Sequence, residues 1–185
     1  RGTITPTELR DWILEKYKVK TETSMLCRAI CQVKKRMFME LSQFGTINAF
    51  LNALSQNNEM TKTSLMTTNG VFVRAFVAIG MCVDGFHHST RVIGLDACHI
   101  KAPYGGVILV MTVLDGNGQV FPGALGVAES ENVDTWRLFL FQAKLAFHLE
   151  DDGDGLVVLS DREKGIDIAL NAILAHAQHS FCVYH

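Results

Sequence analysis

The sequence predicts an α/β protein in which a mixed sheet core follows a small all-helical module. Apolar residues recur at helical spacing in the N-terminal part, whereas short extended apolar segments dominate from Arg91 onward and finally alternate with helical segments. The 185 residues are 48% hydrophobic, which is sufficient for a packed core. We expect three parts: a helix-turn-helix-like module at 1–45, a helical connector at 46–88, and the sheet core at 89–185.

Two helices are expected in the first module. Thr5-Pro6-Thr7-Glu8 combines a hydroxyl cap, a proline in the first turn and an acid, which is typical of a helix start. A second helix, at 24–38, has an apolar face and an opposite basic face. Such a basic face is typical of a helix that contacts DNA, and a solvated charged face is the alternative. The candidate DNA-binding residues are Arg28, Lys34, Lys35 and Arg36.

The connector is expected to hold a third helix at 46–55 and a short strand at 64–67. Residues 71–83 are apolar almost throughout, and such a run fits either a buried helix or two strands. Its length and its flanking residues favour the helix.

Five strands and two helices are expected in the core. Asp115-Gly-Asn-Gly118 predicts a hairpin between the second and third strands, so the first three strands form an antiparallel meander. The last two strands follow helices, which serve as crossovers to parallel positions. Asn132 or Asp134 is expected to cap the first of these helices, and the second spans 165–175. The strands are expected at 91–99, 107–114, 119–128, 156–160 and 179–184.

An aspartate ends each of two apolar strands of this core. Val92-Ile-Gly-Leu95 leads to Asp96, and Leu156-Val-Val-Leu-Ser160 leads to Asp161. A carboxylate at the end of a buried strand is costly unless a partner compensates its charge. Two strands that deliver aspartates to the same end of a sheet make a site for a divalent cation. For each aspartate, capping of the turn or helix that follows is the alternative.

A series of short motifs runs along the chain: Gly94-Leu-Asp-Ala-Cys-His-Ile-Lys101, Tyr104-Gly-Gly106, Leu114-Asp-Gly-Asn-Gly-Gln-Val-Phe-Pro122, Ala128-Glu-Ser-Glu-Asn132, Trp136, Ser160-Asp-Arg-Glu-Lys-Gly165 and His179-Ser-Phe-Cys-Val-Tyr-His185. This series resembles the catalytic domain of Mutator-like (MULE) DNA transposases. The resemblance covers residues 72–185, and the helical part before them is similar to the region that precedes that domain. Ala97 and Cys98 depart from the family, which usually has Gly-Thr-His after the first aspartate.

The resemblance implies a ribonuclease H-like core with strand order 3-2-1-4-5, in which the fourth strand lies beside the first and brings Asp96 and Asp161 together. It implies a DNA transposase of the DD(E) type, whose two-metal site with Mg²⁺ or Mn²⁺ serves DNA strand cleavage and transfer. The third acid of the family is a glutamate that we expect beyond His185, so we interpret the chain as a fragment that is inactive alone. Glu129 and Glu131 are further candidate ligands, with turn or capping roles as the alternative.

Basic residues and a His/Cys series flank these aspartates. Lys101, Arg162 and Lys164 are expected to neutralise DNA phosphates or to pair with nearby acids. His179, Cys182 and His185 recur at every third position, and side chains three apart on a strand face opposite sides. They therefore cannot converge on one metal ion from a straight strand. We expect a structural packing role, and a zinc site shared with residues beyond His185 is the alternative.

The implied partners are DNA terminal repeats and target DNA, and the implied location is the nucleus. Five scattered cysteines are typical of a reducing compartment, which agrees with that location. No run of about 18 apolar residues is present, so we expect no membrane span. Assembly as a homo-oligomer is left open. The alternative function is that of a domesticated, transposase-derived regulator that binds DNA without catalysis.

Overall fold

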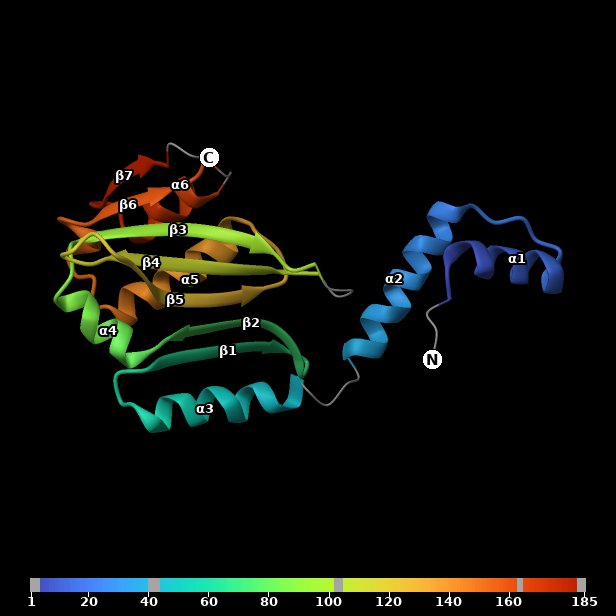
Figure 1. The fold of residues 1–185 in the computed structure, drawn as a ribbon, viewed down its shortest axis with the longest axis horizontal. Coiled ribbons are helices and arrows are strands. Elements are labelled where there is room, and N and C mark those ends of the chain that lie inside the picture. The colour runs from blue at the N-terminus through green and yellow to red at the C-terminus, as the bar shows by residue number, and fades with distance from the viewer. Residues whose placement is uncertain (1–3, 40–43, 102–104, 163–164, 183–185) are drawn as a thin grey trace. The chain divides into compact units, whose positions relative to one another are not determined.

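The computed structural model describes the backbone of residues 4–39, 44–101, 105–162 and 165–182, and their side chains except those of 34–39 and 44. The chain divides into two units: residues 1–44 with 101–104, and residues 45–100 with 105–185. The smaller unit is helical, and the larger unit contains a sheet with helices (Figure 1).

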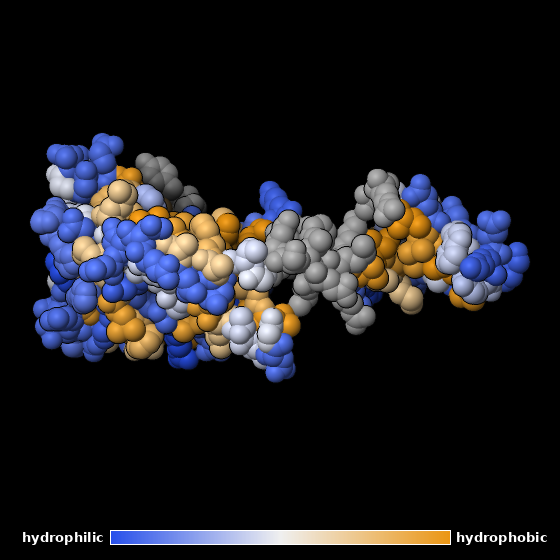
Figure 2. Space-filling model, turned by 90° about the horizontal axis from the view of Figure 1, so that it is seen from below, coloured by the Kyte–Doolittle hydropathy of each residue, from blue (hydrophilic) through white to orange (hydrophobic). Residues whose placement is uncertain are grey.

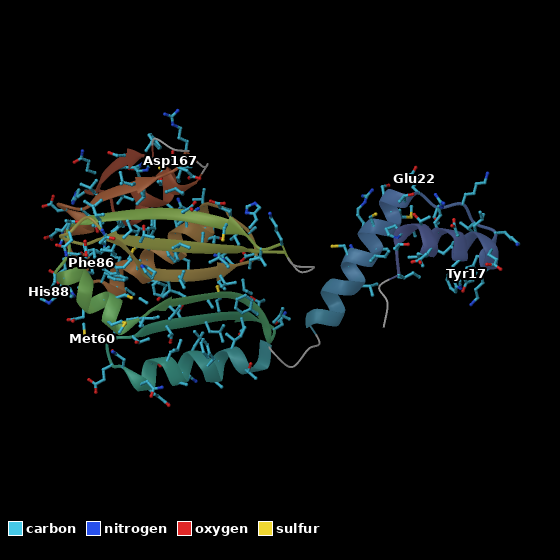
Figure 3. The ribbon with its side chains drawn as sticks, in the orientation of Figure 1. Tyr17, Glu22, Met60, Phe86, His88 and Asp167 are labelled. Atoms are coloured by element: carbon cyan, nitrogen blue, oxygen red, sulfur yellow. The ribbon has the colours of Figure 1, made fainter. Side chains whose placement is uncertain are left out.

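The helical unit contains α1 (Pro6–Tyr17) and α2 (Thr23–Met39), which confirms the two predicted helices. Thr5 caps α1 through a capping box, in which its N–H donates to the Glu8 carboxylate at 2.7 Å and its hydroxyl oxygen accepts from the Glu8 N–H at 3.3 Å. Tyr17 and Glu22 mark the two sides of the connection between the helices (Figure 3). Leu26 of α2 is buried, whereas α1 buries none of its residues, so few of the described side chains of these two helices are buried.

The larger unit contains a seven-stranded sheet in the order β1-β2-β5-β4-β3-β6-β7 (Figure 1). The pairs β3–β6 and β6–β7 are parallel, and all other neighbours are antiparallel. The strands are β1 (Lys62–Thr68), β2 (Val71–Ala78), β3 (Val92–His99), β4 (Val107–Leu114), β5 (Val120–Ala128), β6 (Val157–Ser160) and β7 (Gln178–Phe181). The helices are α3 (Ile47–Asn57), α4 (Gly80–His87), α5 (Val133–Ala146) and α6 (Ile166–Ile173), with short 3₁₀ helices η1 (Phe44–Thr46) and η2 (Asp151–Gly153).

The prediction of a helix at 71–83 was wrong, because β2 occupies most of this run and α4 begins at Gly80. An apolar strand between two other strands lacks a clear alternation of polar and apolar residues, so pattern alone does not distinguish it from a buried helix. Residues 46–88 are therefore not wholly helical. Since β1 and β2 join the sheet beside β5, the sheet has seven strands rather than five, and the order 3-2-1-4-5 does not describe it fully.

The other predicted strands and helices are present, with ends shifted by a few residues. Asp115 forms the hairpin turn between β4 and β5, because its carboxylate accepts from the N–H groups of Asn117 at 2.8 Å and Gln119 at 2.7 Å. Asn132, rather than Asp134, caps α5 and accepts from the Thr135 N–H at 2.9 Å.

Helices α5 and α6 cover one face of the sheet, and the main hydrophobic core lies between them and the strands (Figure 1). Ile93, Leu95 and Leu109 face these helices and are at most 3% exposed. Helix α4 adds Phe86, labelled in Figure 3, whose ring meets that of Phe147 edge to face with centroids 5.3 Å apart. This core fixes the positions of the central strands, and therefore of the residues at their ends.

The opposite face of the sheet, here called the open face, carries the alternate residues of the same strands. Gly94, Asp96 and Val110 lie on it, and none of the described helices of the larger unit lies in front of β3, β4 or β5 on this side (Figure 1). Leu125 and Leu159, also on this face, are each 39% exposed. On another side of the larger unit, apolar and hydrophilic residues are interspersed (Figure 2). None of the described helices is long and apolar enough to cross a membrane.

Candidate functional site

Asp96 lies in the second half of β3, on the open face of the sheet. Ile93 and Leu95 face the core, so the alternation of the strand places the Asp96 side chain on the other side. Asp96 is exposed, and its carboxylate accepts a hydrogen bond from the Ala97 N–H at 2.8 Å. The strand thus presents this carboxylate to solvent rather than to the core.

Asp161 directly follows β6 and is half-buried. β6 is parallel to β3, and Leu95 is paired with Ser160, which confirms the predicted neighbourhood of these two strands. Asp96 and Asp161 are the next residues after this pair. Adjacent strands lie about 4.8 Å apart and paired residues share a face, so the two aspartates occupy neighbouring positions at one end of the sheet.

The carboxyl end of β5 lies at the same end of the sheet. His99 of β3 pairs with Val107 of β4, and Val107 pairs in turn with Ala128 of β5. Glu129 follows Ala128 directly, and Glu131 lies two residues further along the chain. The topology therefore brings both candidate glutamates to the end of the sheet that carries the aspartates.

Glu129 is bound by Arg74 of β2. The Nε and Nη2 atoms of Arg74 donate to the two carboxylate oxygens of Glu129 at 3.0 and 2.6 Å, and Nη1 donates to the Asp134 carbonyl oxygen at 3.3 Å. The Arg74 side chain is only 17% exposed, so this bidentate pair satisfies a largely buried charge. The arrangement joins β2, β5 and α5, and it favours the structural alternative for Glu129.

Glu131 has a comparable structural partner in Trp136. The indole Nε1–H of Trp136 donates to the Glu131 carboxylate at 3.1 Å. Trp136 lies in the first turn of α5 and is 0% exposed, so Glu131 satisfies an N–H group that would otherwise be buried without a partner. This contact favours the capping or turn alternative for Glu131.

The Arg74–Glu129 pair is expected to make a contribution to the free energy of unfolding that is lost at low pH. Hydrogen bonds from Arg74 hold the pKa of the Glu129 carboxyl below its ordinary value. Because the folded-state pKa is lowered, the contribution is present above the unfolded-state pKa of about 4.3 and is lost as pH falls through the folded-state pKa. Since Glu129 is half-exposed, we expect Glu129→Gln to lower the free energy of unfolding by only about 1 kcal/mol at pH 7.

Urea denaturation of the wild type and Glu129→Gln between pH 7 and pH 3 measures this contribution. The difference between the two proteins is expected to shrink below about pH 4.3. Asp134→Asn is a matched control, because Asp134 is 79% exposed and its ion pair with Arg137 is long, at 3.6 Å. A difference between the wild type and Glu129→Gln that does not change with pH would contradict this explanation.

Ser160 is a residue of this region that the sequence analysis did not identify. It is 1% exposed, its hydroxyl donates to the Asp161 carbonyl oxygen at 2.7 Å, and Oγ lies 2.9 Å from Nε2 of His179. The available signal was a hydroxyl residue inside an otherwise apolar strand, because a buried hydroxyl requires hydrogen-bond partners. The identity of the partner depends on the pairing of β6 with β7.

The predicted DNA-binding residues are described only in part. Arg28, Lys101 and Arg162 are exposed, and the guanidinium carbon of Arg162 lies 5.7 Å from the centre of the Phe181 ring. Their contact with DNA stays a prediction. The side chains of Lys34, Lys35 and Arg36, and the whole of Lys164, lie outside the described residues.

The predicted His/Cys series does not form a metal cluster in the part of the chain that the structure describes. Within those residues, no group of three or more His, Cys, Asp or Glu side chains is placed to hold a metal ion. His179 contacts Ser160, Cys182 is half-buried, and His185 lies outside the described residues. A packing role and a shared zinc site both stay predictions for these three residues.

Comparison with known protein families assigns part of the chain to a domain family. A family model for the MULE transposase domain matches residues 92–185, just over half of the chain. The match begins at β3 and includes β6, so it contains Asp96 and Asp161 with the strands that position them. No curated protein matches the chain.

Proposed function

Because the chain belongs to the MULE transposase family, we propose that it is a DNA transposase of the DD(E) type in which Asp96 and Asp161 hold divalent cations. The cations are Mg²⁺ or Mn²⁺, and the partners are the terminal repeats of an element and a target DNA. The proposal includes a ribonuclease H-like relationship of the sheet and a nuclear location.

The donor set fits hard divalent cations. Mg²⁺ and Mn²⁺ prefer carboxylate oxygens, and aspartates occupy both positions after the Leu95–Ser160 pair. One oxygen of Asp96 accepts the Ala97 N–H, and the second oxygen has lone pairs for a cation. The exposure of Asp96 and the half-burial of Asp161 leave this end of the sheet accessible to a DNA backbone.

When bound at such a site, two divalent cations activate the attacking hydroxyl and neutralise the leaving oxygen of a phosphodiester. The residues of this chain hold and orient those cations. β3 pairs with β4 at Asp96 itself and with β6 up to Leu95, so strands on both sides hold the backbone that leads to Asp96. Arg162 is exposed and follows Asp161 in the sequence, and we propose that its charge neutralises a DNA phosphate. We propose the same role for Lys101.

The pairing of Leu95 with Ser160 is the observation that supports the proposal most directly. The competing interpretation was that each aspartate caps the following turn or helix. Gly165, rather than Asp161, occupies the N-cap of α6, and Asp96 lies inside β3 rather than before a helix. Neither aspartate therefore occupies the N-cap of a helix, and adjacency at one end of the sheet is what a shared cation requires.

A titration with Mn²⁺ followed by electron paramagnetic resonance tests the proposal on the 185-residue chain. We expect saturable but weak binding, with a dissociation constant on the order of millimolar, because two carboxylates leave most coordination positions to water. A short DNA duplex should tighten the binding, since phosphate oxygens add ligands. Absence of saturable Mn²⁺ binding with and without DNA would contradict the proposal, and DNA binding without Mn²⁺ binding would favour the non-catalytic regulator.

A further inference from the structure

Strand β7 holds the end of β6 at the residue before Asp161. The Nε2 atom of His179 lies 2.9 Å from Oγ of Ser160, and the Cys182 N–H donates to the Ser160 carbonyl oxygen at 2.7 Å. The second bond continues the parallel ladder between β6 and β7 one step past the last paired residues. Both the side chain and the main chain of Ser160 are therefore fixed by β7.

The direction of these hydrogen bonds follows from the single proton of the Ser160 hydroxyl. That proton is donated to the main-chain oxygen of Asp161 at 2.7 Å. The hydroxyl oxygen can then only accept from His179, so Nε2 of the imidazole carries a proton. Hydrogen bonds therefore run from His179 through Ser160 to the backbone of Asp161.

Burial makes the partners of Ser160 difficult to replace. Ser160 is 1% exposed, so water has little access to its hydroxyl if the imidazole is removed. The ring of Phe181 lies against the imidazole, with centroids 4.8 Å apart, and limits its orientation. The same Phe181 ring lies near the guanidinium of Arg162, so β7 contacts the residues on both sides of Asp161.

We infer that His179 is a positioning residue for Asp161 and acts through Ser160. The inference rests on the proposed function, in which the Asp161 carboxylate holds a divalent cation together with Asp96. Such a carboxylate must keep a fixed position relative to its partner, and residues that orient a ligand commonly change metal affinity when they are replaced. In this role His179 contributes to the site without contacting the metal itself.

Four variants of the chain test the inference. His179→Leu removes the donor, Ser160→Ala removes the intermediate hydroxyl, and His179→Gln supplies an amide N–H in place of the Nε2–H. Ser180→Ala is the matched control, because Ser180 pairs with Leu159 and faces the other side of the sheet. Two quantities are measured for each: the mobility of the Asp161 amide by ¹⁵N relaxation without metal, and the affinity for Mn²⁺.

We expect His179→Leu and Ser160→Ala to raise the mobility of the Asp161 amide and to weaken Mn²⁺ binding about tenfold. His179→Gln should retain Mn²⁺ affinity within about threefold of the wild type, and Ser180→Ala should change neither quantity.

An Asp161 amide that stays equally rigid in His179→Leu and Ser160→Ala would overturn the inference, whether or not the chain binds Mn²⁺. If the Asp161 amide became more mobile while the Mn²⁺ affinity stayed unchanged, the His179–Ser160 contact would have only a structural role. That result would also overturn the positioning role. A wild-type chain that does not bind Mn²⁺ would refute the proposed function itself. The relaxation data are recorded without metal, so they still show whether His179 and Ser160 restrict the mobility of the Asp161 amide.

Discussion

Asp161→Asn and Asp96→Asn are each expected to weaken Mn²⁺ binding on the order of a hundredfold, because each removes one of two charges from a site built on carboxylates. The amide has nearly the same shape as the carboxylate, so the fold should be retained. Asp96 follows Leu95 and Asp161 follows Ser160, and these two residues are paired between β3 and β6. Because the aspartates occupy equivalent positions, we expect similar losses of affinity for both variants. Since they hold the same ions, the double variant should lose much less affinity than two independent effects would predict.

Electron paramagnetic resonance of free Mn²⁺ measures these affinities, with thermal unfolding as a check on the fold. Asp84→Asn is the matched control, because Asp84 is an exposed aspartate on α4, which lies at the opposite end of the sheet from the carboxyl ends of β3 and β5 (Figure 1). If Asp84→Asn weakened binding as much as Asp161→Asn did, the signal would reflect general electrostatic attraction. The proposed site would then have no support from this experiment.

Trp136→Ala is expected to destabilise the larger unit by about 3–5 kcal/mol, which is a large part of the stability of an ordinary domain. Trp136 is 0% exposed, its ring meets that of Phe139 edge to face with centroids 5.8 Å apart, and its indole donates to Glu131. Alanine would leave a cavity between α5 and the sheet and would remove the partner of Glu131. Trp136 belongs to the motif series of the family, and this result would assign it a role in packing.

Urea denaturation followed by far-ultraviolet circular dichroism measures this loss as a change in the free energy of unfolding. Phe141→Ala is the matched control, because Phe141 lies on the same helix and is 46% exposed. We expect this control to cost less than about 1.5 kcal/mol. A cost for Trp136→Ala that is no larger than the cost for Phe141→Ala would contradict the assignment.

The strands that carry the aspartates could be predicted because each is a short apolar run with a polar end. β2 could not, since its apolar residues do not alternate, and this error had a consequence for the site. Arg74 lies on β2, so its pairing with Glu129 depends on a strand that the pattern did not indicate. The contact of Ser160 with His179 could not be predicted either. It depends on the register between β6 and β7, which cannot be derived from the sequence pattern.

The pairing of β3 with β6 also bears on the order in which the protein folds. β4 and β5 are joined by a short turn, so their hairpin closes a small loop and can form early. Leu95 and Ser160 are separated in the chain by β4, β5 and α5, so their contact closes a much longer loop at a higher entropic cost. We therefore expect the two aspartates to come together in a late step of folding, after the hairpin has formed, so that a newly synthesised chain has no assembled site until β6 has joined β3.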